Sequence, residues 1–166
     1  ERVQALAETI LERKPHLVGL QEMFRFDCVE TGTMPGACTL FGGALNDHLQ
    51  LTLDTLGSEY YVAGIVNDLT IPDADFSVPG LPVFLDDDDI PEVFIQVLDR
   101  DVVLARHDVP ATPVPYPCEA FGLHTSEDGC NFNEIAVADA LGETIKIQRG
   151  FVGVDATVNG EDYRIV

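Results

Sequence analysis

The sequence is poor in basic residues and contains no tryptophan. Nine lysines and arginines stand against 29 aspartates and glutamates, which gives the 166 residues a formal net charge of −20. A surface with this charge repels nucleic-acid backbones and anionic membranes at long range, and it attracts divalent cations. The same charge suits a protein that must stay soluble in a salty or extracellular medium. A phosphate-cleaving site is not excluded, because a bound metal ion inverts the local charge.

Long hydrophobic runs are also missing. No apolar stretch approaches the roughly 18 residues that a transmembrane helix needs, and no basic-then-apolar signal peptide is visible. The chain begins inside a predicted helix and ends inside a predicted strand. We therefore expect residues 1–166 to form one partial domain, incomplete at both ends, and we expect a monomer.

Several catalytic motifs do not occur. The sequence has no GxSxG, no GxxxxGK[ST], no HExxH and no GxGxxG after a strand. The histidines are scattered, and each is more typical of a surface or loop position than of a catalytic group: His16, His48, His107 and His124. The remaining candidates for chemistry are carboxylates at strand ends.

The four cysteines form no CxxC pair, which disfavours a zinc site. Three disulfide connectivities are possible. We favour Cys28–Cys38 together with Cys118–Cys130, because each pair brackets a predicted loop that a short bridge could hold. Disulfides would indicate an oxidising compartment, and with the acidity they favour a secreted or periplasmic protein. Four free, buried thiols are the alternative.

The first part of the chain alternates between helical and strand patterns. Apolar residues at helical spacing predict a helix from Val3 to Leu11, which Pro15 ends, followed by a strand at Leu17–Gln21. A second helix is expected at Leu45–Leu56 and a second strand at Tyr60–Val66. This order predicts a layered α/β fold.

The second part of the chain favours loops and strands. A long loop is expected over Asn67–Pro91; its Asp86–Asp89 run could bind a cation, although contiguous aspartates are more typical of a solvated loop. Two strands, Glu92–Leu98 and Val102–Arg106, are expected to be joined by the acidic turn Asp99–Asp101. The remaining predictions are a proline-rich connection at His107–Pro117, a cysteine-bounded loop to Asn133, strands at Thr144–Val152, Val154–Val158 and Tyr163–Val166, and a hairpin turn at Asn159–Gly160.

Glu22 directly follows the first predicted strand, and Asp99 and Asp101 precede "VVLAR". Ligands of layered α/β proteins gather outside strand ends, and Mg²⁺ binds one or two carboxylates together with substrate phosphate. The alternative for Glu22 is a solvated strand end.

Three segments resemble the endonuclease/exonuclease/phosphatase superfamily. "ERVQALAETILERKPHLVGLQEM" (Glu1–Met23) is similar to the first helix and second strand of that family, which end in "LQE". "LDRDVVLAR" (Leu98–Arg106) and "IQRGFVGVDATVNGEDYRIV" (Ile147–Val166) are similar to later strands. The resemblance follows the order of the family and covers most of the chain.

The resemblance implies a DNase-I-like layered α/β sandwich that hydrolyses phosphodiesters or phosphomonoesters with Mg²⁺, or with Mn²⁺ or Ca²⁺. It implies that Glu22 binds the metal and that Asp99 orients a histidine outside the chain, although an acidic turn residue is the alternative for Asp99. Arg100 would contact a substrate phosphate or be an ordinary surface arginine. The substrate could be a lipid, a nucleotide, an inositol phosphate or a nucleic acid.

The sequence departs from the family in what it lacks. The asparagine of the family's first strand, its "NTHL" histidine, its "GDxN" motif and its terminal Asp-His pair do not occur in the chain. We therefore expect these residues alone to be inactive and a longer parent protein to be the enzyme. A non-catalytic, acidic extracellular binding module with the same fold is the alternative.

Overall fold

The computed structural model describes residues 2–72, 78–132, 136–140 and 143–166. Glu1, Asn133 and residues 73–77 of the predicted long loop lie outside this part of the chain. The helices are α1 (Arg2–Arg13) and α2 (His48–Leu56), with short 3₁₀ segments at Ala37–Ala44, Gly57–Glu59 and Cys118–Phe121. The strands are β1 (Leu17–Leu20), β2 (Arg25–Glu30), β3 (Tyr60–Ile71), β4 (Leu81–Val83), β5 (Val93–Arg106), β6 (Ala111–Pro113), β7 (His124–Ser126), β8 (Gly129–Asn131), β9 (Ala136–Ala140), β10 (Glu143–Ile147), β11 (Gly150–Phe151), β12 (Val154–Val158) and β13 (Glu161–Ile165).

The main sheet is organised around β5, which is 14 residues long. β1 and β2 pair in succession with one edge of β5, and β3 and β4 pair with its other edge. All of these pairings are antiparallel. Smaller antiparallel sheets are formed by β7, β8 and β11, by β6, β12 and β13, and by β9 and β10.

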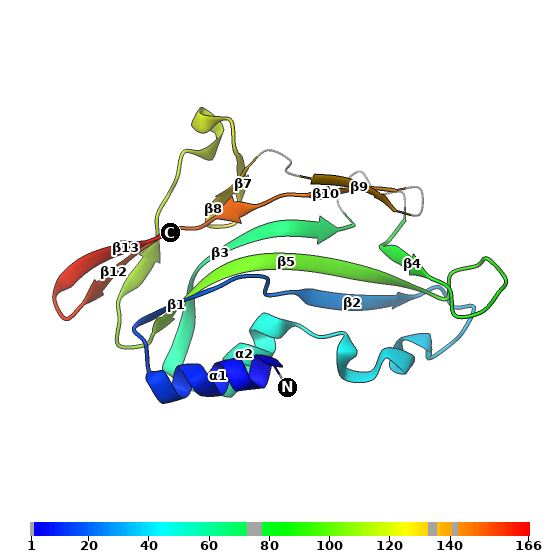
Figure 1. The fold of residues 1–166 in the computed structure, drawn as a ribbon, viewed down its shortest axis with the longest axis horizontal. Helices are drawn as coiled ribbons and strands as arrows, with labels where there is room; N and C mark the ends of the chain where they lie inside the picture. The colour runs from blue at the N-terminus through cyan, green and yellow to red at the C-terminus, as the bar shows by residue number, and fades with distance from the viewer. Residues whose placement is uncertain (1, 73–77, 133–135, 141–142) are drawn as a thin grey trace.

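The two faces of the main sheet pack against different partners (Figure 1). Val102 and Leu104 lie in a core with α1 and α2, whereas Val103 and Ala105 lie in a second core with Val152 and Val154. Side chains of a strand alternate between faces, so Arg100 shares the helical face, and Asp99 and Asp101 share the opposite face.

The expected layered α/β sandwich is wrong. The described chain is mainly antiparallel β-sheet with few helices. The helix–strand order misled the prediction because β1 and β3 both pair antiparallel with the same later strand rather than through βαβ crossovers. The partial domain that we expected over residues 1–166 stays a prediction.

The two helices agree better with the sequence-based predictions than the overall architecture does. α1 extends the predicted helix, and Asp47 caps α2 by accepting a hydrogen bond from the Gln50 amide. β3 and β5, however, are single long strands: β3 continues beyond Val66 into the predicted loop, and β5 runs straight through Asp99–Asp101, where we expected a turn.

The predicted hairpin and disulfides are confirmed. β12 and β13 pair around Asn159 and Gly160, both of which have positive φ (54° and 84°) as a tight hairpin turn requires. Cys28 bonds to Cys38, and Cys118 bonds to Cys130. No helix in the described ranges is long and apolar enough to span a membrane.

Arg100 forms a buried ion pair on the helical face of β5. Its guanidinium lies 2.5 Å from an Asp47 carboxylate oxygen, and its Nε donates to the Met23 carbonyl at 3.0 Å. The Arg100 side chain is 8% exposed. It therefore joins β5, the start of α2 and the segment after β1, which is a structural role and not that of a surface arginine.

We expect the two disulfides to stabilise the fold to similar extents. Each closes a loop of similar length, with sequence separations of 10 and 12, and loop-closure entropy predicts about 3 kcal/mol for each. Replacing either cysteine pair by alanine should lower the free energy of unfolding by about this amount, measured in urea. Peptide mapping without reductant should recover the same two linkages, and any other linkage would contradict the pairing.

Replacing Arg100 should cost far more than replacing an exposed arginine. Arg100→Met leaves Asp47 and the Met23 carbonyl without their donor, and we expect a loss of about 3 kcal/mol in urea unfolding. The matched control is Arg25→Met, which breaks the ion pair between Arg25 and Asp27. Both of these side chains are nearly half exposed, so this variant should lose only about 0–1 kcal/mol of stability. Equal losses in the two variants would show that the Arg100 contacts are not structural.

Candidate functional site

The candidate site lies at the middle of β5, where the pairing is broken on one edge and bulged on the other. On one edge, Leu20 of β1 pairs with Val102 and Arg25 of β2 pairs with Leu98, so residues 21–24 leave the sheet. On the other edge, the register of β3 shifts as it passes the same part of β5. Asp99–Asp101 therefore face an interruption on both sides.

Glu22 lies in the break between β1 and β2. Its φ is +56°, a left-handed conformation that is uncommon for a residue other than glycine. The backbone holds it there, because the Glu22 amide donates to Asp101 Oδ1 at 3.1 Å and the Met23 amide donates to the Arg100 carbonyl at 2.8 Å. The Glu22 side chain is 59% exposed, so its carboxylate is accessible to a ligand.

Asp68 is the extra residue of a bulge in β3. Asn67 pairs with Arg100 and Leu69 pairs with Asp99, which leaves Asp68 with no residue opposite it. Bulges re-aim side chains, and here the Asp68 carboxylate is fully buried. Asp99 is buried as well, so two buried carboxylates and Asp101 gather on the face of β5 opposite the helices.

Arg149 connects these carboxylates. It lies between β10 and β11, and its Nη1 is 3.1 Å from Asp99 Oδ2 and 4.0 Å from Asp68 Oδ2. Its Nη2 is 3.4 Å from Glu22 Oε1. Because it contacts both Asp99 and Glu22, the guanidinium extends from the buried aspartates to the accessible glutamate. The Arg149 side chain itself is 43% exposed.

Burial and mutual repulsion shift the acidity of the aspartates. Desolvation, followed by the negative charges of Asp101 and Asp99, raises the pKa of Asp68 from 3.8 to about 7, and the opposing effect of Arg149 is smaller. Desolvation also raises the pKa of Asp99, with Arg149 again acting in the opposite direction. Shifted carboxyl groups of this kind are common at functional sites, and they also occur in structural ion-pair networks.

A hollow of about 770 Å³ borders Glu22. Glu22, Met23 and Phe24 line one side, and apolar residues of α1 and α2, including Leu6 and Leu51, line the other. Glu22 therefore borders a hollow that has both polar and apolar walls, while its carboxylate contacts Arg149.

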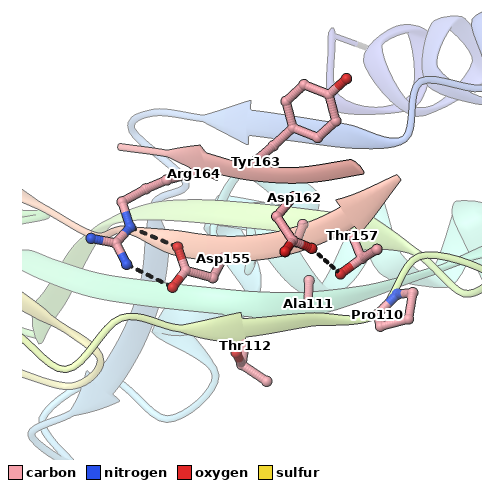
Figure 2. A pocket seen from close by; sticks show the side chains of 9 residues that line it. Pro110, Ala111, Thr112, Asp155, Thr157, Asp162, Tyr163 and Arg164 are labelled. Atoms are coloured by element: carbon pink, nitrogen blue, oxygen red, sulfur yellow. Dashed lines mark hydrogen bonds and ion pairs between the residues drawn. The ribbon is translucent and has the colours of Figure 1, made fainter. Parts of the chain in front are cut away.

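A second hollow, of about 670 Å³, lies over β6, β12 and β13 (Figure 2). Its charged groups are paired with one another: Arg164 donates to both oxygens of Asp155, at 2.6 and 2.7 Å, and Thr157 donates to Asp162 at 2.8 Å. These pairs occupy the groups that could bind a ligand, so we assign no function to this surface.

The predicted aspartate run contributes an acidic group of its own. One carboxylate oxygen from each of Asp86, Asp88 and Glu92 lies within 4.8 Å of the others, and Asp86 and Asp88 are exposed. Glu92 is buried and accepts a hydrogen bond from the Leu85 amide at 2.6 Å. This group could bind a cation, but exposed acidic groups are common without one.

The structure brings two of the predicted site residues together. Glu22 and Asp99 both contact Arg149, whereas Arg100 points to the opposite face and contacts Asp47. Two residues of the cluster are not predicted from the sequence: Asp68, which lies in the predicted long loop, and Arg149, which lies inside a predicted strand. Arg149 belongs to the "QRG" segment of the family resemblance, and that segment is the feature of the sequence that could have pointed to it.

Comparisons of the chain with protein-family profiles, with curated proteins and with solved structures found no match. The superfamily resemblance therefore stays a prediction.

We expect the stability of the protein to fall between pH 4 and pH 7 because of Asp68. Its pKa is raised in the folded state, so the folded protein binds more protons than the unfolded chain in this window. The contribution is complete below about pH 4 and is lost as the pH rises through about 7, with a slope of at most about 1.4 kcal/mol per pH unit.

Urea unfolding of the wild type and of Asp68→Asn across this range, in a chelating buffer, measures the effect. The variant lacks the titrating group, so its stability relative to the wild type should increase from pH 4 to pH 7. Parallel curves for the two proteins would contradict the assignment.

Proposed function

We propose that this chain supplies the metal-binding part of a phosphoester hydrolase site. The observation that carries the proposal is the arrangement of Glu22, Arg149 and Asp99: an accessible carboxylate and a partly exposed guanidinium lie side by side above a buried aspartate. Carboxylate oxygens are the ligands of hard divalent cations, and arginine binds phosphate oxygens through its planar fork.

Glu22 would hold Mg²⁺, or Mn²⁺ or Ca²⁺ in its place. The donor set fits such an ion, because Glu22 offers oxygen ligands at the solvent-accessible end of the cluster. A bound divalent cation supplies Lewis-acid stabilisation of the charge that develops on the phosphoryl group. Arg149 would position the phosphate beside it.

Asp99 would act as a positioning residue. It is buried and it already orients one cationic group, because its Oδ2 accepts from Arg149. In the proposed reaction it would similarly orient a histidine that acts as a general acid or base, and the family resemblance implies that this histidine lies outside the chain.

Lipids, nucleotides, inositol phosphates and nucleic acids all remain candidate substrates, although the charge of −20 disfavours long nucleic acids. The two disulfides favour an oxidising compartment, and we place the protein in a secreted or periplasmic setting as part of the same proposal.

Glu22→Gln tests the metal assignment in the protein that carries this chain together with any natural flanking segments. The change keeps the shape of the side chain and removes the charged ligand. Since the Lewis acidity of a metal is worth several kcal/mol, Mg²⁺-dependent hydrolysis of bis(4-nitrophenyl) phosphate should fall by about 100-fold or more. Arg149→Lys should lower the rate as well, because it removes the fork that contacts phosphate.

The matched control is Glu161→Gln, an exposed glutamate at the start of β13, which should leave the rate unchanged. Equal rates for Glu22→Gln and the wild type would rule out Glu22 as the metal ligand. If Mg²⁺ binding depends on Glu22 but no phosphoester is hydrolysed, the non-catalytic binding module is the better description.

A further inference from the structure

Four buried side-chain oxygens below Arg149 have no hydrogen-bond donor among the residues that the structure describes. They are both carboxylate oxygens of Asp68, Oδ1 of Asp99 and Oδ1 of Asn131. The three residues are 1%, 3% and 4% exposed. Buried polar atoms are almost always paired in folded proteins, so four orphaned acceptors in one place indicate a missing positively charged or donating partner.

The orientation of Asn131 is fixed by its other contacts. Its Nδ2 donates to the Asn67 carbonyl at 2.6 Å and to Gln148 Oε1 at 3.3 Å. The Asn67 backbone carbonyl can only accept, so the nitrogen of the Asn131 amide must face it. The amide oxygen of Asn131 is thereby directed away from these groups.

Gly150 shows that several of these oxygens point to one small region. A Cβ atom on Gly150 would lie 2.9 Å from Asp68 Oδ1 and 2.8 Å from the Cys130 carbonyl oxygen, and it would clash with Asn131 Oδ1. A carboxylate, an amide carbonyl and a backbone carbonyl, from β3 and β8, therefore converge beside the backbone of β11. Any side chain at residue 150 would collide with these oxygens, so the position requires glycine.

The charges of the described side chains around this region are unbalanced. Asp68, Asp99, Asp101 and Glu22 bring four carboxylates, and Arg149 supplies one positive charge to them. Arg149 Nη1 is 4.0 Å from Asp68 Oδ2, which is too far for a hydrogen bond. The neighbouring carboxylate of Asp101 can bond to Asp68 only if the two share a proton.

We propose that Asp68, Asn131 and the Cys130 carbonyl bind a calcium ion. Calcium accepts a mixture of carboxylate, amide and backbone carbonyl oxygens in flexible geometry, whereas magnesium requires near-octahedral coordination and usually keeps several waters. Water completes the coordination, and the charges of Asp99 and Asp101 lie near enough to Asp68 to attract the cation. The ion joins β3 to the small sheet of β7, β8 and β11, and it is separate from the cation that Glu22 would hold in the proposed function.

Calcium binding to the chain itself tests the inference. The protein is stripped with EGTA, placed in 150 mM NaCl to screen its diffuse negative charge, and titrated with CaCl₂ by calorimetry while its melting temperature is followed in parallel. We expect one calcium ion per chain at this site. At a free concentration of 100 times Kd, calcium should raise the melting temperature by about 5–10 °C, and MgCl₂ should have a much smaller effect.

Two variants of the site give opposite expectations. Asp68→Asn removes the charged ligand and should weaken calcium binding by about 100-fold or more. Asn131→Asp adds a charged ligand and should tighten calcium binding while making the calcium-free protein less stable. If Asp68→Asn does not fold, Asn131→Asp still tests the site, because a merely structural asparagine would show no calcium-dependent recovery of stability.

The controls separate this site from the other acidic groups. Glu22→Gln, and the double variant Asp86→Asn with Asp88→Asn, should retain the calcium-dependent rise in melting temperature. Loss of that rise in the double variant, or in Glu22→Gln, would place the ion elsewhere and overturn the inference. A wild-type protein without a calcium-specific shift would overturn it as well, and would indicate that Asp68 and Asp101 share a proton instead.

Discussion

The structure depends on one long strand, β5, which continues through a region where the pairing on each of its edges is irregular. β5 continues straight through Asp99–Asp101, while β1 and β2 leave a gap on one edge and β3 bulges at Asp68 on the other. The continuity of β5 places Asp99 and Asp101 on one face and Arg100 on the other. The two interruptions admit Glu22 and Asp68 to the same region, so the geometry of the candidate site follows from the hydrogen-bond ladder of a single strand.

Charged side chains are paired on one face of β5 and incompletely paired on the other. On the helical face, Arg100 and Asp47 form a buried pair whose donors and acceptors match, which makes it a structural element. On the opposite face, several carboxylates gather around the guanidinium of Arg149, and several buried oxygens have no donor among the described residues. Such an imbalance lowers stability unless a ligand or a proton offsets it, which is why function is assigned to this face.

The family resemblance implied the wrong architecture, and the site residues that it implied stay a prediction. It predicted a layered α/β sandwich, and the chain forms mainly antiparallel sheet instead. It also singled out Glu22 and Asp99, which are far apart in sequence and which the structure joins through Arg149. The phosphoester hydrolase proposal rests on that arrangement of charged groups.

The sequence by itself determined the local features: α1 and its end before Pro15, the Asn159–Gly160 hairpin, and the two disulfides. These depend on contacts within about a dozen residues, which propensity and spacing describe well. Only the tertiary structure decided the site. The bulge that buries Asp68, the face that Arg100 occupies, and the contact of Arg149 with Glu22 across 127 residues arise from strand pairing. Between strands that are far apart in the sequence, no turn fixes the pairing register, and it depends on which faces of the strands are buried in the assembled sheet.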